Sequence, residues 1–150
     1  MATIVVSAER TVAAPAGAVY GYIADMREHH PHFLPSAFAD FQVEAGGVGE
    51  GTITRFTVTA GGRTRHYRMK VAEPEPGRVL TESDANSSLV TTTTVTPQGS
   101  MSLVRISTAW EGAGGMGGFF ERLFAPRVMR GIYADQLERL GAYAREHRGT

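Results

Sequence analysis

The spacing of apolar residues divides the chain into a strand, a helical segment, a long β-rich region and a C-terminal helix. Residues 3 to 13 are rich in Thr, Val and Ile, and Ala14-Pro15 ends this strand. Proline suits the first turn of a helix, where no N–H is needed, so a helix is expected to begin there. Apolar residues then recur at helical spacing, and Pro31 and Pro35 divide the segment into two short helices.

Residues 38 to 111 consist of short β-rich runs separated by turn clusters. The clusters are rich in Gly, Pro, Asn, Asp and Ser and leave room for six strands; they lie at 46–47, 61–62, 74–77, 84–87 and 97–100. This spacing permits tight hairpins but no crossover helix, so we expect an antiparallel meander. A doubly wound parallel fold is therefore excluded.

Residues 119 to 147 have the pattern of an amphipathic helix that lies on the sheet. Pro126 falls inside the pattern and should kink the helix, or divide a short lead-in helix from a main one of about twenty residues, ~30 Å long. The apolar residues step by three or four, namely Leu123, Phe124, Val128, Ile132, Tyr133, Leu137, Leu140 and Ala144.

Composition favours one folded domain over residues 1–150 and narrows the range of partners. A chain of 150 residues with 42% apolar residues can bury a single core. Its 15 basic and 15 acidic residues cancel, so nucleic acid is not an expected partner. The sequence has no cysteine, no secretory signal and no membrane span, which predicts a cytoplasmic protein without disulfides. The oligomeric state is not predicted.

Several motifs resemble one known superfamily over essentially the whole chain. They are residues 10–20 with Ile23-Ala24-Asp25, then His30-Pro31-His32-Phe33-Leu34-Pro35, Gly49-Glu50-Gly51-Thr52, 77–80 and 137–140. These segments resemble the START-like (SRPBCC) superfamily of polyketide cyclases, lipid-transport domains and birch-pollen-type allergens. The expected fold class is α+β, a helix-grip fold in which a seven-stranded curved antiparallel sheet wraps around the long C-terminal helix, with two short helices after the first strand.

The resemblance implies an elongated cavity between the sheet and the long helix. A bent sheet around one helix closes its concave face only if bulky side chains fill it, so leftover space invites an apolar ligand. Strand alternation turns Phe56, Tyr67, Met69, Ile106 and Trp110 inward, although plain core packing is the alternative for each. The full set of candidate ligand-binding residues is His32, Phe33, Phe56, Tyr67, Met69, Ile106, Trp110, Phe120, Phe124, Met129 and Tyr133.

Two motifs resemble binding sites but lack the context that such sites need. The histidines in His29-His30-x-His32 point apart on a helical segment without a carboxylate, so we predict no metal site. Residues 112–117 spell G-x-G-x-x-G, yet no βαβ unit follows, so we predict no dinucleotide and no other cofactor. This segment is interpreted as a hinge over the cavity mouth, with Met116, Phe119 and Phe120 as a lid.

The strand charges Arg55, Arg65, Glu82 and Asp84 face either the cavity or solvent, depending on strand parity. Solvent is the favoured side, because charged residues are seldom buried without partners. The sequence contains no G-x-S-x-G or H-E-x-x-H motif, no Cys nucleophile and no evident acid–base pair of carboxylates, so no residue is assigned a catalytic role.

Three functions remain open. The first is a binding or carrier protein for a small hydrophobic molecule, such as a lipid, an isoprenoid quinone or a polyketide-like compound. The second, implied by the resemblance, is a cyclase/aromatase-type enzyme that uses Tyr67, Arg65 or His32 in the same cavity. The third is an interaction module of the co-chaperone type. A roomy cavity with two or more buried ionisable groups would favour the enzyme, and a uniformly apolar cavity would favour the carrier.

Overall fold

The computed structural model describes the backbone of residues 3–112 and 115–147 and the side chains of residues 3–112 and 125–147. Seven strands form one antiparallel sheet in the order β1-β7-β6-β5-β4-β3-β2, which confirms the expected helix-grip fold. The strands are β1 (Thr3–Val12), β2 (Phe38–Ala45), β3 (Ile53–Ala60), β4 (Arg63–Glu75), β5 (Val79–Asp84), β6 (Val90–Gln98) and β7 (Met101–Glu111).

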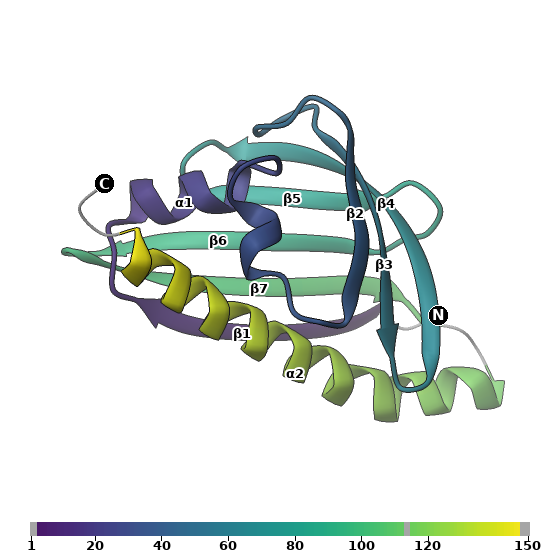
Figure 1. The fold of residues 1–150 in the computed structure, drawn as a ribbon. Coiled ribbons are helices and arrows are strands. Elements are labelled where there is room, and N and C mark those ends of the chain that lie inside the picture. The colour runs from purple at the N-terminus through teal and green to yellow at the C-terminus, as the bar shows by residue number, and fades with distance from the viewer. Residues whose placement is uncertain (1–2, 113–114, 148–150) are drawn as a thin grey trace.

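The sheet is strongly bent. In Figure 1, β5, β6 and β7 run across the view, whereas β2 and β3 run steeply down it. Register shifts within the β2–β3 and β4–β5 pairs accompany this bend, since bulges increase local twist and curvature. The bend gives the sheet a concave face, and the C-terminal helix lies across that face.

Two short helical elements follow β1, as the prolines predict. Helix α1 (Ala16–Ala24) starts directly after Pro15 and buries Val19, Tyr20 and Ile23. The second element is a 3₁₀ helix, η1 (His30–Phe33). It ends two residues before Pro35, and Leu34 between them is extended, because a following proline disfavours helical geometry.

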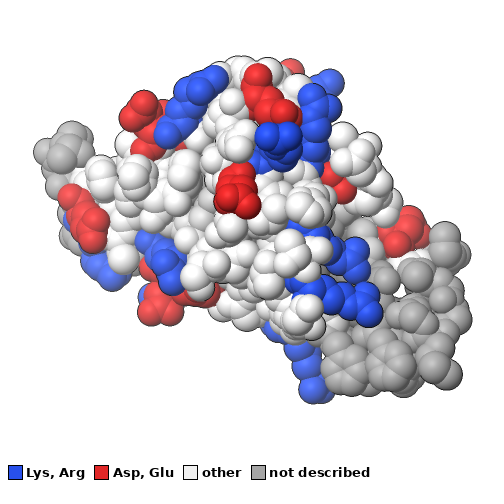
Figure 2. All heavy atoms as spheres, turned by 45° about the vertical axis from the view of Figure 1, so that its right-hand side comes forward, with Lys and Arg blue, Asp and Glu red and all other residues white. Residues whose placement is uncertain are grey.

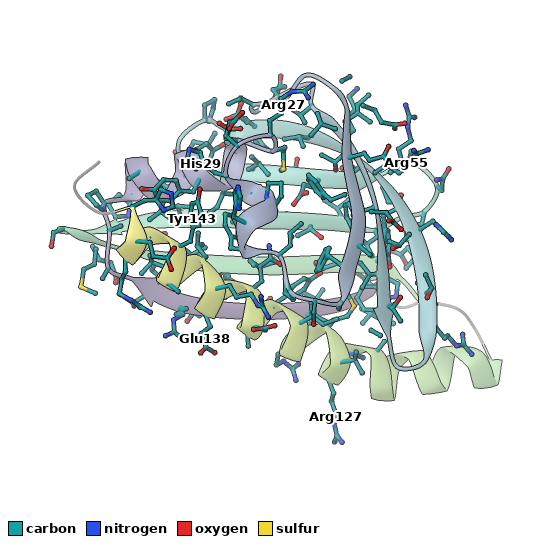
Figure 3. All side chains as sticks on the ribbon, in the orientation of Figure 1. Arg27, His29, Arg55, Arg127, Glu138 and Tyr143 are labelled. Carbon is teal, nitrogen blue, oxygen red and sulfur yellow. The ribbon has the colours of Figure 1, made fainter. Side chains whose placement is uncertain are left out.

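Helix α2 (Gly115–Glu146) is one helix that contains Pro126, so the alternative of two separate helices is wrong. A proline removes only its own N–H from the backbone ladder, and a helix can continue beyond it. Tyr133, Leu137 and Leu140 are buried against the sheet. Arg127 and Glu138 point away from it (Figure 3). Among the helices in the described ranges, none is long and apolar enough to cross a membrane.

A glycine-rich loop before β3 fastens the end of α1 to the sheet. The N–H of Met26 donates to the Gly47 carbonyl at 2.8 Å, and the N–H of Gly49 donates to the Ala24 carbonyl at 3.0 Å. The hydroxyl of Tyr20 on α1 donates to Glu73 of β4 at 2.7 Å. These bonds hold the segment that carries η1 in place over the concave face.

Candidate functional site

A cavity of about 730 Å³ lies between the concave face of the sheet and α2. Its lining residues come from η1, β2–β7 and α2, with the loop between β5 and β6 at one end. This volume lies within the range of sites that enclose drug-sized molecules. The sheet and the helix therefore leave the interior incompletely filled, as the bent sheet predicts.

Four aromatic side chains form one wall of the cavity. The ring of Phe56 on β3 contacts those of Phe38, Phe41 and Tyr67, with centroid distances of 5.4, 5.9 and 5.7 Å. The register explains the contact with Tyr67, because Phe56 and Tyr67 are direct cross-strand partners. Met69, Ile106, Met129 and Ile132 add apolar surface elsewhere, so a ligand body here meets mainly apolar groups.

A row of polar side chains crosses the sheet beneath α2. Glu82 on β5 pairs with Thr91 on β6, which pairs with Thr108 on β7, so the three side chains share the concave face. Glu82 lines the cavity, and among the described residues its carboxylate has no hydrogen bond or ion pair. Burial raises the pKa of Glu82 to about 7, because an apolar surrounding disfavours the charged form.

Two tyrosines line the same cavity as this carboxyl group. The hydroxyl of Tyr133 on α2 is hydrogen-bonded to Thr108, which is bonded to Thr91 at 2.8 Å. Burial raises the pKa of Tyr133 to about 12, and the nearby charge of Glu82 adds to the rise. Burial also raises the pKa of Tyr67, whose hydroxyl has no hydrogen-bond partner among the described residues. Both phenols therefore stay protonated at neutral pH.

His30 supplies a polar group on the η1 side of the cavity. Its Nδ1 lies 2.8 Å from the carbonyl of Ile23, which can only accept, so Nδ1 carries the proton. Burial lowers the pKa of His30 to about 4, which keeps the ring neutral and leaves Nε2 as an acceptor. The buried amide of Gln136 lines the cavity from α2.

The family model for "Polyketide cyclase / dehydrase and lipid transport" matches residues 3–145. The chain belongs to this family.

Solved structures with the same fold agree with that assignment. The KanY protein, solved by NMR, is 35% identical; the match covers 97% of this chain and 99% of that one, with a TM-score of 0.86. Norcoclaurine synthase from Thalictrum flavum is 21% identical over 99% and 90% of the two chains, with a TM-score of 0.72. The Zhui aromatase/cyclase from a Streptomyces species is 16% identical over 99% and 98%, with a TM-score of 0.76. No curated protein sequence matches the chain.

In this member of the polyketide cyclase/dehydrase family, many of the residues singled out from the sequence lie together in the cavity. Phe56, Tyr67, Met69, Ile106, Trp110, Met129 and Tyr133 all line it. Whether they contact a ligand stays a prediction. The side chains of Phe120 and Phe124, and those of the predicted lid (Met116, Phe119 and Phe120), lie outside the described residues.

Two other candidates from η1 do not line the cavity. Phe33 is 1% exposed and packs in the core. His32 is exposed and stacks on Tyr143 of α2, with ring centroids 5.8 Å apart. The residue of this helix that lines the cavity is His30, because η1 turns it inward.

The neighbouring histidines have separate surroundings. His29 lies 2.6 Å from the hydroxyl of Tyr143, and Figure 3 shows these two side chains between α1 and the end of α2. His30 points into the cavity and His32 toward solvent. Within the described part of the chain, no three His, Cys, Asp or Glu side chains are arranged to hold a metal ion.

The preference for solvent is wrong for two of the four strand charges. Glu82 lines the cavity, and Asp84 is buried, accepting hydrogen bonds from Ser87 Oγ and the Arg68 N–H at 2.6 and 3.2 Å. Arg55 is exposed, as expected, whereas Arg65 lies on the cavity side but stays exposed.

One sequence signal could have found Glu82. The buried Leu80 has the same parity as Glu82 and Asp84 on β5, which places all three on the concave face. Val79, also apolar, has the opposite parity, so the alternation alone was ambiguous.

Proposed function

We propose that this protein is an enzyme that binds a small, mainly apolar molecule in the cavity and moves protons on it, in a reaction of the cyclisation or dehydration type. The observation that carries this proposal is the carboxyl group of Glu82. It lies in the cavity without a partner among the described residues, and burial raises its pKa to about 7.

A carboxyl group with this pKa suits acid–base chemistry. At neutral pH both its protonated and its ionised forms are populated, so it can take and return a proton in one cycle. A purely passive carrier would gain nothing from this group, because burying an unpaired carboxyl group costs stability. The cavity also contains His30, Tyr67 and Tyr133, so it holds several ionisable groups rather than a uniformly apolar surface.

The chemistry of these groups suits the loss of water from a β-hydroxy ketone. The ionised Glu82 takes a proton from the carbon beside the ketone, and its protonated form then gives that proton to the departing hydroxyl, which leaves as water. The product is an unsaturated ketone, so all atoms balance. The hydroxyl of Tyr67 would donate a hydrogen bond to the ketone oxygen as negative charge develops there.

Two structural relatives support a site of this kind. One is named an aromatase/cyclase. The other is a norcoclaurine synthase whose structure holds dopamine and hydroxybenzaldehyde, two small aromatic compounds. Compounds of that size would fit against the aromatic wall of Phe38, Phe41 and Phe56.

The proposal is tested by turnover of a set of β-hydroxy ketones and poly-β-ketones with aromatic or alkyl substituents. Quenching of Trp110 fluorescence reports binding, because Trp110 lines the cavity and is the single tryptophan of the sequence. Mass spectrometry of the products reports loss of water or ring closure. We expect at least one compound to bind and to be converted.

The matched control is Glu82→Gln, which keeps the size of the side chain and removes its acid–base function. This variant should still show quenching with the same compound but form product about 100- to 10,000-fold more slowly. Equal conversion by both proteins, or conversion by neither, would contradict the proposal.

A carrier role is the second candidate, and the aromatic wall favours it. A carrier should retain a hydrophobic molecule through purification, visible by native mass spectrometry. Retention of such a molecule with equal affinity in the wild type and in Glu82→Gln, without conversion, would support carriage of a lipid, quinone or polyketide-like compound instead.

A further inference from the structure

Strand β4 places two arginines on the concave face, at the end of the cavity next to the β3–β4 hairpin. Arg65 pairs with Val58 and Arg63 pairs with Ala60, and all four residues line the cavity. Both arginines are exposed, so this end is open to solvent. Figure 2 brings this side of the molecule forward and shows Lys and Arg side chains gathered on it.

These two arginines differ from those on the outer face of the same strands. On the outer face, Arg68 and Arg55 share Glu44, at 2.8 and 4.0 Å. Within the described ranges, neither Arg63 nor Arg65 has a carboxylate within 4.0 Å.

Of the acidic groups on the cavity side, two already accept hydrogen bonds and the third lies farther from the two arginines. Glu111 at the rim accepts a hydrogen bond from Thr3 at 2.8 Å, and Asp84 is held by Ser87. Glu82 lies further along the cavity, paired with Val71 in the β4–β5 register, six residues beyond Arg65 on β4.

We propose that Arg63 and Arg65 bind the anionic group of the cavity's ligand, which is therefore an amphipathic organic anion. Guanidinium groups suit carboxylates and phosphates because their N–H donors form paired, charge-assisted hydrogen bonds. The apolar body of the ligand lies against the Phe56 wall. This inference rests on the proposed function and specifies the substrate class of that site.

The charges also set the orientation of the ligand. An anion near Glu82 would be repelled by the ionised carboxylate and would lose solvent in an apolar surrounding. At the hairpin end the same anion meets two cations and stays partly hydrated. The uncharged part of the ligand, which carries the reacting carbonyl, is thereby directed toward Glu82 and Tyr67.

A matched pair of fluorescent probes tests the inference. Anilinonaphthalene sulfonate is an amphipathic anion, and phenylnaphthylamine has the same ring system without the sulfonate. Energy transfer from Trp110 shows that each probe occupies the cavity. The wild type should bind the sulfonate more tightly, and added salt should weaken only that probe.

The decisive variant is Arg63→Gln/Arg65→Gln. It should lower the affinity for the sulfonate by about tenfold or more, since hydrogen bonds to charged groups are lost. The affinity for the uncharged probe should not change. Arg55→Gln is the control, because Arg55 is an exposed arginine of the outer face (Figure 3), and it should leave both affinities unchanged.

The outcomes separate this inference from the proposed function. If the uncharged probe binds in the cavity but the double variant keeps full affinity for the sulfonate, the anion site is wrong and the cavity remains. An equal loss for both probes also refutes the anion site. If neither probe binds in the cavity, both proposals fail.

Discussion

Replacing Glu82 by Gln should stabilise the protein above pH 7 by about 1–3 kcal/mol while lowering its turnover about 100- to 10,000-fold. The folded protein holds the pKa of Glu82 at about 7, above its ordinary value of 4.5. Below the lower of these two pKa values, Glu82 is protonated in both the folded and the unfolded protein, so its burial costs the least stability there. As the pH rises toward 7, the unfolded chain loses its proton first, and stability falls until the folded form ionises too.

Glutamine has no such proton, so the variant should not show this decline. The free energy of unfolding, measured by urea denaturation at several pH values between about 4 and 8, would show the difference between the two proteins growing with pH. Glu138→Gln serves as the control, because Glu138 is exposed on the outer face of α2. A constant difference between wild type and Glu82→Gln at all pH values would refute a carboxyl group buried in the cavity.

His30 should change the free energy of unfolding with pH in the opposite direction, and the same experiment should show it. Its pKa is lowered from 6.5 to about 4 by burial, so the unfolded chain binds a proton before the folded one as the pH falls. Stability from His30 is therefore fully present above 6.5 and is lost as the pH falls toward 4. In Glu82→Gln the opposing effect of Glu82 is absent, so the stability should fall more steeply as the pH is lowered between those two pKa values of His30.

Replacing Gly49 by Ala should destabilise the protein by about 2–4 kcal/mol. Gly49 has φ of +68°, which side chains rarely adopt, and an added Cβ would lie 2.2 Å from Oε1 of Glu73. Glu73 cannot easily move, because it accepts hydrogen bonds from Tyr20 and from the Glu50 N–H at 2.7 and 2.8 Å. The substitution would therefore disturb the anchor between α1 and the sheet.

Gly51→Ala is the matched control. Gly51 also has a positive φ, +89°, but nothing lies within 4 Å of a Cβ added there. Its substitution should cost only about 1–2 kcal/mol, from backbone strain alone. Urea denaturation of both variants distinguishes the two contributions, and equal losses would show that contact with Glu73 is unimportant.

Local sequence rules predicted most of the fold. Pro15 and Pro35 bounded the two short helical elements, and the turn clusters bounded the strands, because these residues act through the backbone of their immediate neighbours. The alternation along β4 also placed Tyr67 and Met69 on the correct face, since on that strand the apolar parity from Tyr67 onward is unambiguous.

The arrangement of the site depended on contacts between segments that lie far apart in the sequence. β5 has an apolar residue at both parities, Val79 and Leu80, so only its pairing with β4 and β6 decided that Glu82 faces inward. The inward turn of His30 rather than His32 likewise depends on how η1 packs beneath α2. Helix α2 continues through Pro126, where the local pattern left a break equally acceptable.

The sequence by itself determined the order of elements, the antiparallel meander and the apolar face of the last helix, because each follows from periodicity and turn chemistry within a few residues. Tertiary structure alone decided how much space remains beneath that helix and which polar groups border it. Both depend on sheet curvature and on side chains from six strands and two helices meeting in one place, so they have no local signature.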